Sequence, residues 1–304
     1  MNSTRNINND MQEFLKYPKL EPFNFMGLDR QDYRASKVVI FPVPYSSTTC
    51  WKTWTNEGPQ AIIEASRHME LYDIESKRDP SKDGIFTLES LEPSKDSPKE
   101  TIFRIKKVID RILKDKKFPL MLGGEHSITL GSVLSFKEKF SNFSVLQIDA
   151  HADLRNLYEG SKYHHGSVMR RIRELKIPVT QVGLRSISEE DAGYVRKAKI
   201  KTIFPAPDLP IDEIIATLGE KVYLTIDLDG LDPSIMPSVG TPEPGGLGWH
   251  ELLNFIKQLS QKRKIIGADV VELAPTAGLH APDFLAAKLV YKIISYTLTS
   301  KMKF

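Results

Sequence analysis

The sequence predicts an α/β protein built around a mostly parallel sheet. Short apolar runs alternate along the chain with segments of helical period, and the runs are continuously apolar instead of alternating with polar residues. Strands of that kind are covered on both faces, and strands joined through helices pair in parallel. The apolar runs occupy residues 37–41, 119–122, 144–148, 179–183, 222–226 and 265–271.

The remaining segments fit between these strands. Helical periodicity is clearest over residues 102–113, 167–175, 249–259 and 281–296. Residues 1–36 are mixed in composition and predict an N-terminal arm that wraps the body or meets a neighbouring subunit. Residues 37–304 are then expected to form a single domain. Within it, the polar, proline-rich segment 76–100 predicts an exposed excursion, because the series of strands continues after it.

Composition narrows the class of protein. The 304 residues include 42 Lys and Arg against 39 Asp and Glu, and a net charge of +3 does not favour a partner such as nucleic acid or a membrane surface. The single cysteine, Cys50, excludes an intrachain disulfide and a cysteine-rich metal site. The first ten residues are polar and lack the apolar core of a secretory signal, so we expect a cytoplasmic protein.

Three of the predicted strands end in polar clusters. Glu125, His126 and Ser127 follow the second run, an Asp-Ala-His-Ala-Asp sequence at 149–153 follows the third, and Asp-Leu-Asp at 227–229 follows the fifth. Ligands bind at the carboxyl ends of parallel strands, so these clusters are expected to meet. A fully extended chain would separate the first and last aspartates of 149–153 by roughly 13 Å. The chain must therefore curl if both bind one centre.

Four aspartates gathered at one buried edge would repel one another, and burial makes each charge more costly. Two divalent cations would balance four carboxylates. Carboxylates with a few imidazoles suit Mn²⁺, and also Fe²⁺, Co²⁺, Ni²⁺ or Zn²⁺. A pair of such ions activates water near neutral pH. The clusters together therefore predict a two-metal hydrolytic site.

Other polar residues have plainer explanations. A lone aspartate after a strand usually caps a helix or forms a turn, and Asp232 before Pro233 is assigned to that role. His68, His250 and His280 lie in helix-like or turn segments and are expected to be surface or capping residues. Glu125 would point away from His126 in extended chain, so we expect it to support the site rather than bind metal.

The motifs together resemble the ureohydrolase family of arginases and agmatinases, and most closely the bacterial agmatinases. The resemblance covers residues 36–300 and rests on GPQAIIEAS (58–66), GGEHS (123–127), DAHAD (149–153), HHG (164–166), TIDLDGLDPS (225–234), GTPEPGG (240–246) and VVELAP (270–275). It implies a three-layer α/β/α sandwich with an eight-stranded parallel sheet. It also implies assembly as a homotrimer or homohexamer.

The resemblance further implies two Mn²⁺ ions per subunit. One would be held by His126, Asp149, Asp153 and Asp227. The other would be held by His151, Asp149, Asp227 and Asp229, with Asp149 and Asp227 bridging.

Three more residues match family positions that act on the substrate. Glu272 would bind the guanidinium group, since a carboxylate can pair with two N–H groups at once. His165, in preference to its neighbour His164, would move protons to the leaving amine, because an imidazole titrates near neutral pH. Thr241 matches a family threonine near the substrate and would hydrogen-bond a substrate N–H.

The implied reaction hydrolyses a guanidinium group to urea and a primary amine. Residues 153–155 (DLR) and 158–160 (YEG) resemble bacterial agmatinases, so agmatine would be converted to putrescine and urea, a step of polyamine biosynthesis. Arg155 leaves an alternative open. It could receive the carboxylate of arginine or another guanidino acid, or form a salt bridge at the rim. Trp51 and Trp54 could narrow the pocket, stack on a cation or pack at a subunit contact.

Two other classes of protein share features with this sequence. A deacetylase-like amide hydrolase shares the overall fold but would use one zinc ion, which the paired acidic clusters argue against. A regulatory scaffold that has lost catalysis would be expected to lack metal ligands, and none of the six is missing here.

Overall fold

The computed structural model describes residues 17–51 and 53–299. In these residues an eight-stranded sheet runs in the order β2-β1-β3-β8-β7-β4-β5-β6, and every pairing is parallel. The predicted parallel sheet is thereby confirmed. The strands are β1 (Val38–Val43), β2 (Ile85–Thr87), β3 (Phe118–Gly123), β4 (Ser144–Ile148), β5 (Val179–Leu184), β6 (Ile203–Pro205), β7 (Lys221–Asp227) and β8 (Lys264–Val271).

Helices connect the strands. The α-helices are α2 (Gly58–Ser66), α3 (Pro98–Lys114), α4 (Thr129–Lys139), α5 (Val168–Glu174), α6 (Glu189–Ala198), α7 (Ile211–Ala216), α8 (Trp249–Lys262) and α9 (Ala281–Thr299). Short 3₁₀ helices are η1 (Phe25–Gly27), η2 (Trp54–Glu57), η3 (Pro80–Asp83), η4 (His126–Ile128), η5 (His165–Ser167) and η6 (Leu228–Gly230). No helix within the described ranges has both the length and the apolar character that crossing a bilayer requires.

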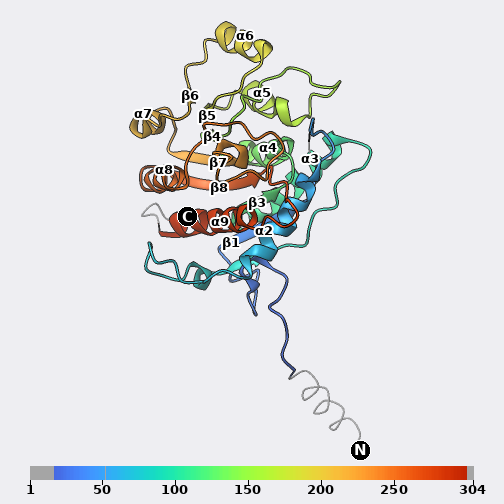
Figure 1. Cartoon of the computed structure of the whole chain (residues 1–304), viewed down its shortest axis with the longest axis vertical. Coiled ribbons are helices and arrows are strands. Elements are labelled where there is room, and N and C mark those ends of the chain that lie inside the picture. Colours follow the sequence, from blue (N-terminus) through green and yellow to red (C-terminus); the bar gives the residue numbers. More distant parts are fainter. Residues whose placement is uncertain (1–16, 52, 300–304) are drawn as a thin grey trace, which may run out of the picture.

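Helices cover both faces of the sheet (Figure 1). Val38 and Ile40 of β1 pack in the core that also contains residues of α2, α7, α8 and α9. Val39 and Phe41, which alternate with them, pack in the core built with α3, α4 and α5. Because successive side chains of a strand point to opposite faces, both faces must be apolar. The continuous apolar runs of the sequence follow from these three layers.

Local signals in the sequence set the ends of the longer helices. Helix α3 begins where the Ser97 side chain accepts a hydrogen bond from the Glu100 backbone N–H, with Pro98 in the first turn. Its buried face repeats every three or four residues, at Ile102, Ile105, Ile109 and Ile112. That face packs against α4 on one side of the sheet.

The structure adds elements that the sequence analysis did not predict. Strands β2 and β6 have three residues each and lie at the two edges of the sheet. Strands this short give no recognisable apolar run. Strand β2 lies within residues 76–100, and its Ile85 is fully buried, so that segment is not simply an exposed excursion. Helices α4, α6 and α7 were also not predicted.

The described part of the predicted N-terminal arm, residues 17–36, packs against the body. Phe25 is fully buried in the core, and its backbone N–H donates to Thr87 Oγ1 of β2 at 3.0 Å. The Met26 N–H donates to Ser66 Oγ of α2 at 2.8 Å. Residues 1–16 of the predicted arm and 300–304 of the predicted domain lie outside the described residues.

An ionic cluster with a buried part, Asp73 and Lys292, and an exposed part, Glu75, holds the segment after α2 against α9. Lys292 Nζ lies 2.7 Å from Asp73 Oδ1 and 2.9 Å from Glu75 Oε2, while Ser295 and Tyr296 donate to these two carboxylates. Burial alone would raise the pKa of Asp73, but hydrogen bonds from Lys292 and Ser295 outweigh it and lower that pKa to about 2. Ionised Asp73 therefore stabilises the folded state.

We expect the Asp73→Asn substitution to destabilise the protein by about 2 kcal/mol at pH 6. The folded pKa lies below the ordinary value of 3.8, so the unfolded state binds more protons as the pH falls between these values. The difference in the free energy of unfolding between wild type and variant should therefore shrink from about pH 4 downward and nearly vanish near pH 2. Urea unfolding across this range measures it. A difference that stays constant from pH 6 to pH 2.5 would contradict the assignment.

Candidate functional site

The candidate site lies at the carboxyl ends of four adjacent strands. These strands are β3, β8, β7 and β4, which are consecutive in the sheet although they are widely separated in the sequence. The three predicted polar clusters follow β3, β4 and β7, and Glu272 follows β8. Parallel pairing therefore brings all of them to one edge, as the sequence analysis expected.

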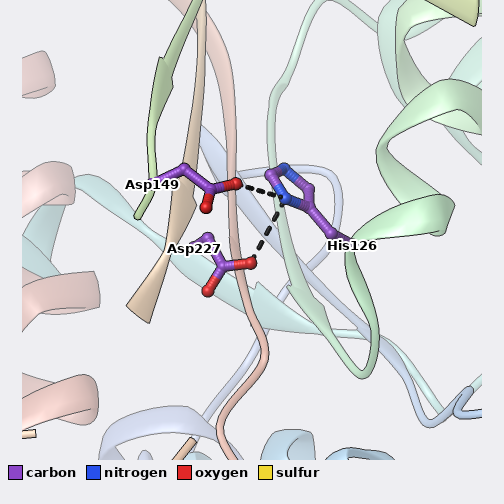
Figure 2. Close-up of side chains that lie close together, drawn as sticks. All are labelled: His126, Asp149 and Asp227. Atoms are coloured by element: carbon purple, nitrogen blue, oxygen red, sulfur yellow. Dashed lines mark ion pairs between the residues drawn. The ribbon is translucent and has the colours of Figure 1, made fainter. Parts of the chain in front are cut away.

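The first group of potential ligands surrounds His126. Its Nδ1 atom lies 3.1 Å from Asp149 Oδ2, 3.2 Å from Asp153 Oδ2 and 3.3 Å from Asp227 Oδ2. Figure 2 shows the ring pointing toward the carboxylates of Asp149 and Asp227. The imidazole is buried, yet Nδ1 has no hydrogen-bond partner among the described residues. A cation between the ring and the carboxylates would satisfy this atom.

The second group shares Asp149 with the first. His151 Nδ1 lies 2.9 Å from Asp229 Oδ2 and 3.6 Å from Asp149 Oδ1. In each group three potential ligand atoms lie within 4.8 Å of one another: His126, Asp149 and Asp227 in one, Asp149, His151 and Asp229 in the other. Because Asp149 contributes to both groups, two neighbouring cations would share it.

The backbone turns sharply where the clusters require it. Asp153 has φ 52°, in the left-handed region, and the turn brings its carboxylate to the His126 ring at the first group. The curl that the spacing of 149–153 predicted is confirmed. Glu272 also lies in the left-handed region, with φ 68°, directly after β8. Both residues hold sparsely populated conformations at the site, and Asp is one of the few residues that tolerate them.

Electrostatics favour cations in this cluster. Burial raises the pKa of Asp153 to about 6, with a further contribution from the charge of Asp149. Burial and the charges of Asp229 and Asp149 raise the pKa of Asp227 well above its ordinary value. Four carboxylates and two imidazoles form a donor set suited to divalent cations of the Mn²⁺ type. The residues present therefore fit a pair of divalent ions.

A pocket of about 260 Å³ opens above these groups and contains the predicted catalytic residues. His165 Nδ1 lies 3.3 Å from Glu272 Oε1, and the same oxygen accepts the His126 backbone N–H at 2.7 Å. Thr241 also lines the pocket, and its hydroxyl lies 3.5 Å from Asp229 Oδ2. The pocket thus places Glu272 and His165 beside the ligand clusters.

The two neighbouring histidines differ in their surroundings. His164 is buried, and its Nδ1 accepts the Gly166 N–H at 3.2 Å. Burial and the charges of His165 and Arg155 lower the pKa of His164 to about 3, so it is neutral. His165 instead lines the pocket. The geometry therefore favours His165 over His164 as the residue that meets a substrate.

The residues whose roles were left open lie around the pocket mouth. Arg155 lines the pocket and stacks its guanidinium over the Tyr158 ring at 4.3 Å. Its positive charge lowers the pKa of the Asp191 carboxyl, and the roles of Arg155 at the rim stay predictions. Trp51 lines the pocket, whereas Trp54 begins η2 and is exposed away from the lining.

Sequence analysis missed one charged residue of the pocket, Asp191. It is buried and lines the pocket, and its Oδ1 atom has no hydrogen-bond partner among the described residues. Its backbone N–H donates to the side chain of Ser188, the N-cap of α6. A Ser three residues before an acid is the usual pattern of a capped helix, so the sequence alone gives no signal of a pocket residue.

Two supporting side chains hold the loops of the site. Arg185 donates to the carbonyls of Gly183, Asp229 and Glu243, at 3.0, 2.7 and 2.7 Å, and so joins the end of β5 to two site loops. Glu125 is buried and accepts the Thr48 N–H at 2.6 Å and the Ser127 hydroxyl at 2.5 Å. The support role predicted for Glu125 is confirmed, and the sequence analysis did not identify Arg185.

The remaining predictions for single residues also hold. The Asp232 carboxylate accepts backbone N–H groups of Ser234, Gly245 and Gly246, as expected of a turn former. His68, His250 and His280 are exposed. They lie outside the pocket that contains the ligand clusters.

An eight-stranded parallel sheet with this cluster at its carboxyl edge defines the class of ureohydrolases, enzymes that act on guanidino groups. The Arginase family pattern matches residues 36–295, and the chain belongs to that family.

Several relatives are similar over nearly their whole length. The N(1)-aminopropylagmatine ureohydrolase of Synechocystis sp. is 42% identical over 282 residues, which cover 89% of this chain and 92% of that protein. The agmatinase of Pyrococcus horikoshii is 32% identical, with 88% and 95% covered. The crystal structure of agmatine ureohydrolase of Thermoplasma volcanium matches with a TM-score of 0.84 at 30% identity, covering 94% of this chain and 97% of that one.

Proposed function

We propose that this ureohydrolase holds two Mn²⁺ ions and hydrolyses a guanidine with a cationic tail to urea and a primary amine. The observation that carries the proposal is the unpartnered Nδ1 atom of buried His126, which faces three carboxylate oxygens at 3.1–3.3 Å. When bound, such ions supply Lewis acidity and make water a stronger nucleophile near neutral pH. Ni²⁺, Co²⁺ or Fe²⁺ could take the same donor set.

The ligand assignment follows the two groups. One ion would be held by His126, Asp149, Asp153 and Asp227. The other would be held by His151, Asp149, Asp227 and Asp229. The membership of Asp149 in both groups supports its role as a bridge.

Glu272 would orient the substrate. Its carboxylate is buried, lines the pocket and is fixed by the His126 backbone N–H. A planar guanidinium can donate two parallel hydrogen bonds to a carboxylate. This pairing would hold the guanidinium carbon against the ligand clusters, and the Thr241 hydroxyl, which lines the same pocket, would accept a hydrogen bond from a substrate N–H.

His165 would supply the proton that the reaction needs. Hydrolysis adds the oxygen of water to the guanidinium carbon and breaks the bond to the alkyl nitrogen, which leaves as an amine after taking up one proton. Burial disfavours a charged imidazole, but Cys50 and Glu272 outweigh burial and raise the pKa of His165 well above its usual value. A protonated His165 in the pocket is placed to act as the acid.

The outer pocket supports a substrate with a cationic tail. Asp191 lines this pocket and presents a buried oxygen with no hydrogen-bond partner among the described residues. Burial raises the pKa of Asp191, whereas the positive charge of Arg155 in the same pocket lowers it. An ammonium group would satisfy that oxygen, whereas a carboxylate would be repelled by it. This favours agmatine over arginine and other guanidino acids, and Arg155 would then form part of the wall.

Two guanidines with cationic tails of different length are candidate substrates. The resemblance to bacterial agmatinases predicts agmatine, which would yield putrescine and urea and place the enzyme in polyamine biosynthesis. The 42% identical relative is named for N(1)-aminopropylagmatine, which has the same guanidinium and an additional amine in its tail. That similarity makes N(1)-aminopropylagmatine the second candidate. We further propose a cytoplasmic homotrimer or homohexamer.

A panel of guanidines tests the proposal. Manganese-loaded protein is incubated with agmatine, N(1)-aminopropylagmatine, arginine and 4-guanidinobutyrate, and urea release gives kcat/KM for each. We expect both cationic-tailed compounds to exceed both acids. Higher activity on an acid would favour the guanidino-acid alternative. No urea from any compound would favour a catalytically silent scaffold.

Replacing Asp149 by Asn should remove metal binding and activity together, because this residue belongs to both ligand groups. Calorimetric titration of the metal-free protein with Mn²⁺ and urea release measure the two effects. Asp232→Asn is the matched control, since Asp232 shapes a turn outside the pocket. An Asp149→Asn variant that keeps wild-type activity would contradict the assignment.

Replacing His165 by Ala should lower kcat at least about a hundredfold, the usual contribution of general acid catalysis. Metal content should stay unchanged, because His165 belongs to neither ligand group. Metal analysis of the purified variant and steady-state kinetics check both. A variant that loses metal along with activity would show that His165 acts on the metal centre instead.

Replacing Asp191 by Asn should lower kcat/KM for the cationic-tailed guanidines about tenfold or more, through KM, because a buried ion pair with the tail is lost. The ratio of agmatine to 4-guanidinobutyrate turnover should fall. Glu189→Gln, which removes an exposed charge from the same helix, serves as the control. Equal losses on agmatine and 4-guanidinobutyrate would exclude Asp191 from tail recognition.

A further inference from the structure

The buried carboxylate of Asp269 lies on the Nε2 side of the His126 ring, whereas the ligand clusters lie on the Nδ1 side. Asp269 is fully buried on the central strand β8. Tyr223 OH lies 2.6 Å and Thr129 Oγ1 3.0 Å from its Oδ2 atom, and Thr225 Oγ1 lies 2.5 Å from Oδ1. Asp269 forms no ion pair within the described part of the chain. Burial raises the pKa of Asp269, and the hydrogen bonds from the three hydroxyl groups act in the opposite direction.

Strand pairing brings together the hydrogen-bond network of Asp269, Tyr223, Thr225 and Thr129. Thr225 of β7 is the direct neighbour of Asp269 of β8 in the sheet register. Tyr223 and Thr225 alternate with apolar residues and share one side of β7 with Asp227, one of the predicted ligands. The network therefore lies on the same side of the sheet as the candidate centre.

Thr225 links the network to the centre. Its Oγ1 atom lies 2.9 Å from His126 Nε2, while His126 Nδ1 faces the carboxylates of the first group. The Thr225 hydroxyl has a single proton, and it donates that proton to Asp269 Oδ1, while Tyr223 and Thr129 donate to the other oxygen of the same carboxyl group. That proton therefore lies toward Asp269, and Thr225 offers a lone pair to His126. The imidazole must then carry its proton on Nε2, which leaves the Nδ1 lone pair directed at the cluster.

We propose that Asp269, acting through Thr225, is a positioning residue that fixes the tautomer of His126 and thereby sets the cation affinity of the His126 group. This inference rests on the proposed function, because it requires the His126 group to bind a divalent cation. Without the Thr225 hydroxyl, the Nε2 proton has no partner, and the tautomer with its proton on Nδ1 becomes competitive. That tautomer cannot bind a cation through Nδ1.

Variants of Thr225 and Tyr223 separate this role from mere packing. Thr225→Val keeps the shape of the side chain and removes the link to His126, whereas Thr225→Ser keeps the hydroxyl. Tyr223→Phe removes a different donor from the same Asp269 carboxylate and leaves the link intact. If the Thr225→Val protein does not fold, Thr225→Ala replaces it, because the smaller alanine side chain also removes the hydroxyl and introduces no steric conflict.

Metal-free protein is titrated with Mn²⁺ by calorimetry, and circular dichroism confirms the fold of each variant. We expect Thr225→Val to weaken one of two binding events about 10- to 100-fold, the usual effect of removing a partner of a ligand imidazole. Thr225→Ser should stay within about threefold of wild type. Tyr223→Phe should lower the melting temperature while both affinities stay near wild type.

Two results would overturn the inference while leaving the proposed function in place. One is a Thr225→Val protein that binds both ions as wild type does. The other is a Thr225→Ser protein that loses as much affinity as Thr225→Val, which would point to packing. Wild-type protein that binds no divalent cation would instead overturn the proposed function, and the inference with it.

Discussion

The mutual repulsion of four buried aspartates is the constraint on which the rest of this structure depends. Asp149, Asp153, Asp227 and Asp229 are each at least nine-tenths buried, and they lie around two imidazoles at one edge of the sheet. A folded chain holds such a cluster only if the surrounding structure is stable enough to oppose the repulsion, or if cations relieve it. The central position of β7 and β8 and the two apolar cores provide that stability.

Backbone N–H groups fix the carboxylates before any ligand arrives. The Ala150 N–H donates to Asp229, the His151 N–H donates to Asp149, and the Asp229 N–H donates to Asp227, at 2.6–3.0 Å. In each case one oxygen is held by the main chain and the other remains near an imidazole. The geometry is therefore built into the strand ends, and little rearrangement is needed to accept cations.

The sequence predicted the parts of the molecule whose signals are local. Continuous apolar runs indicated the six longer strands, and the aspartates and histidines at their ends indicated one shared edge. The edge strands β2 and β6 were missed because three residues carry no periodic pattern. Asp191 and Asp269 were missed for another reason. Asp191 lies in the first turn of a helix, where an acidic residue usually serves as part of the helix cap. The role of Asp269, inside an apolar strand, depends on its contact with Thr225 of the neighbouring strand, which the sequence does not reveal.

The strand order also bears on when during biosynthesis the centre can form. His126 precedes Asp229 by more than a hundred residues, and the strands that place them are separated in the sheet by β8, which is made last. A nascent chain that has reached only Asp153 offers an incomplete set of donors and has no β8 to align them. The complete set of donors is therefore present and aligned only after translation of nearly the whole chain.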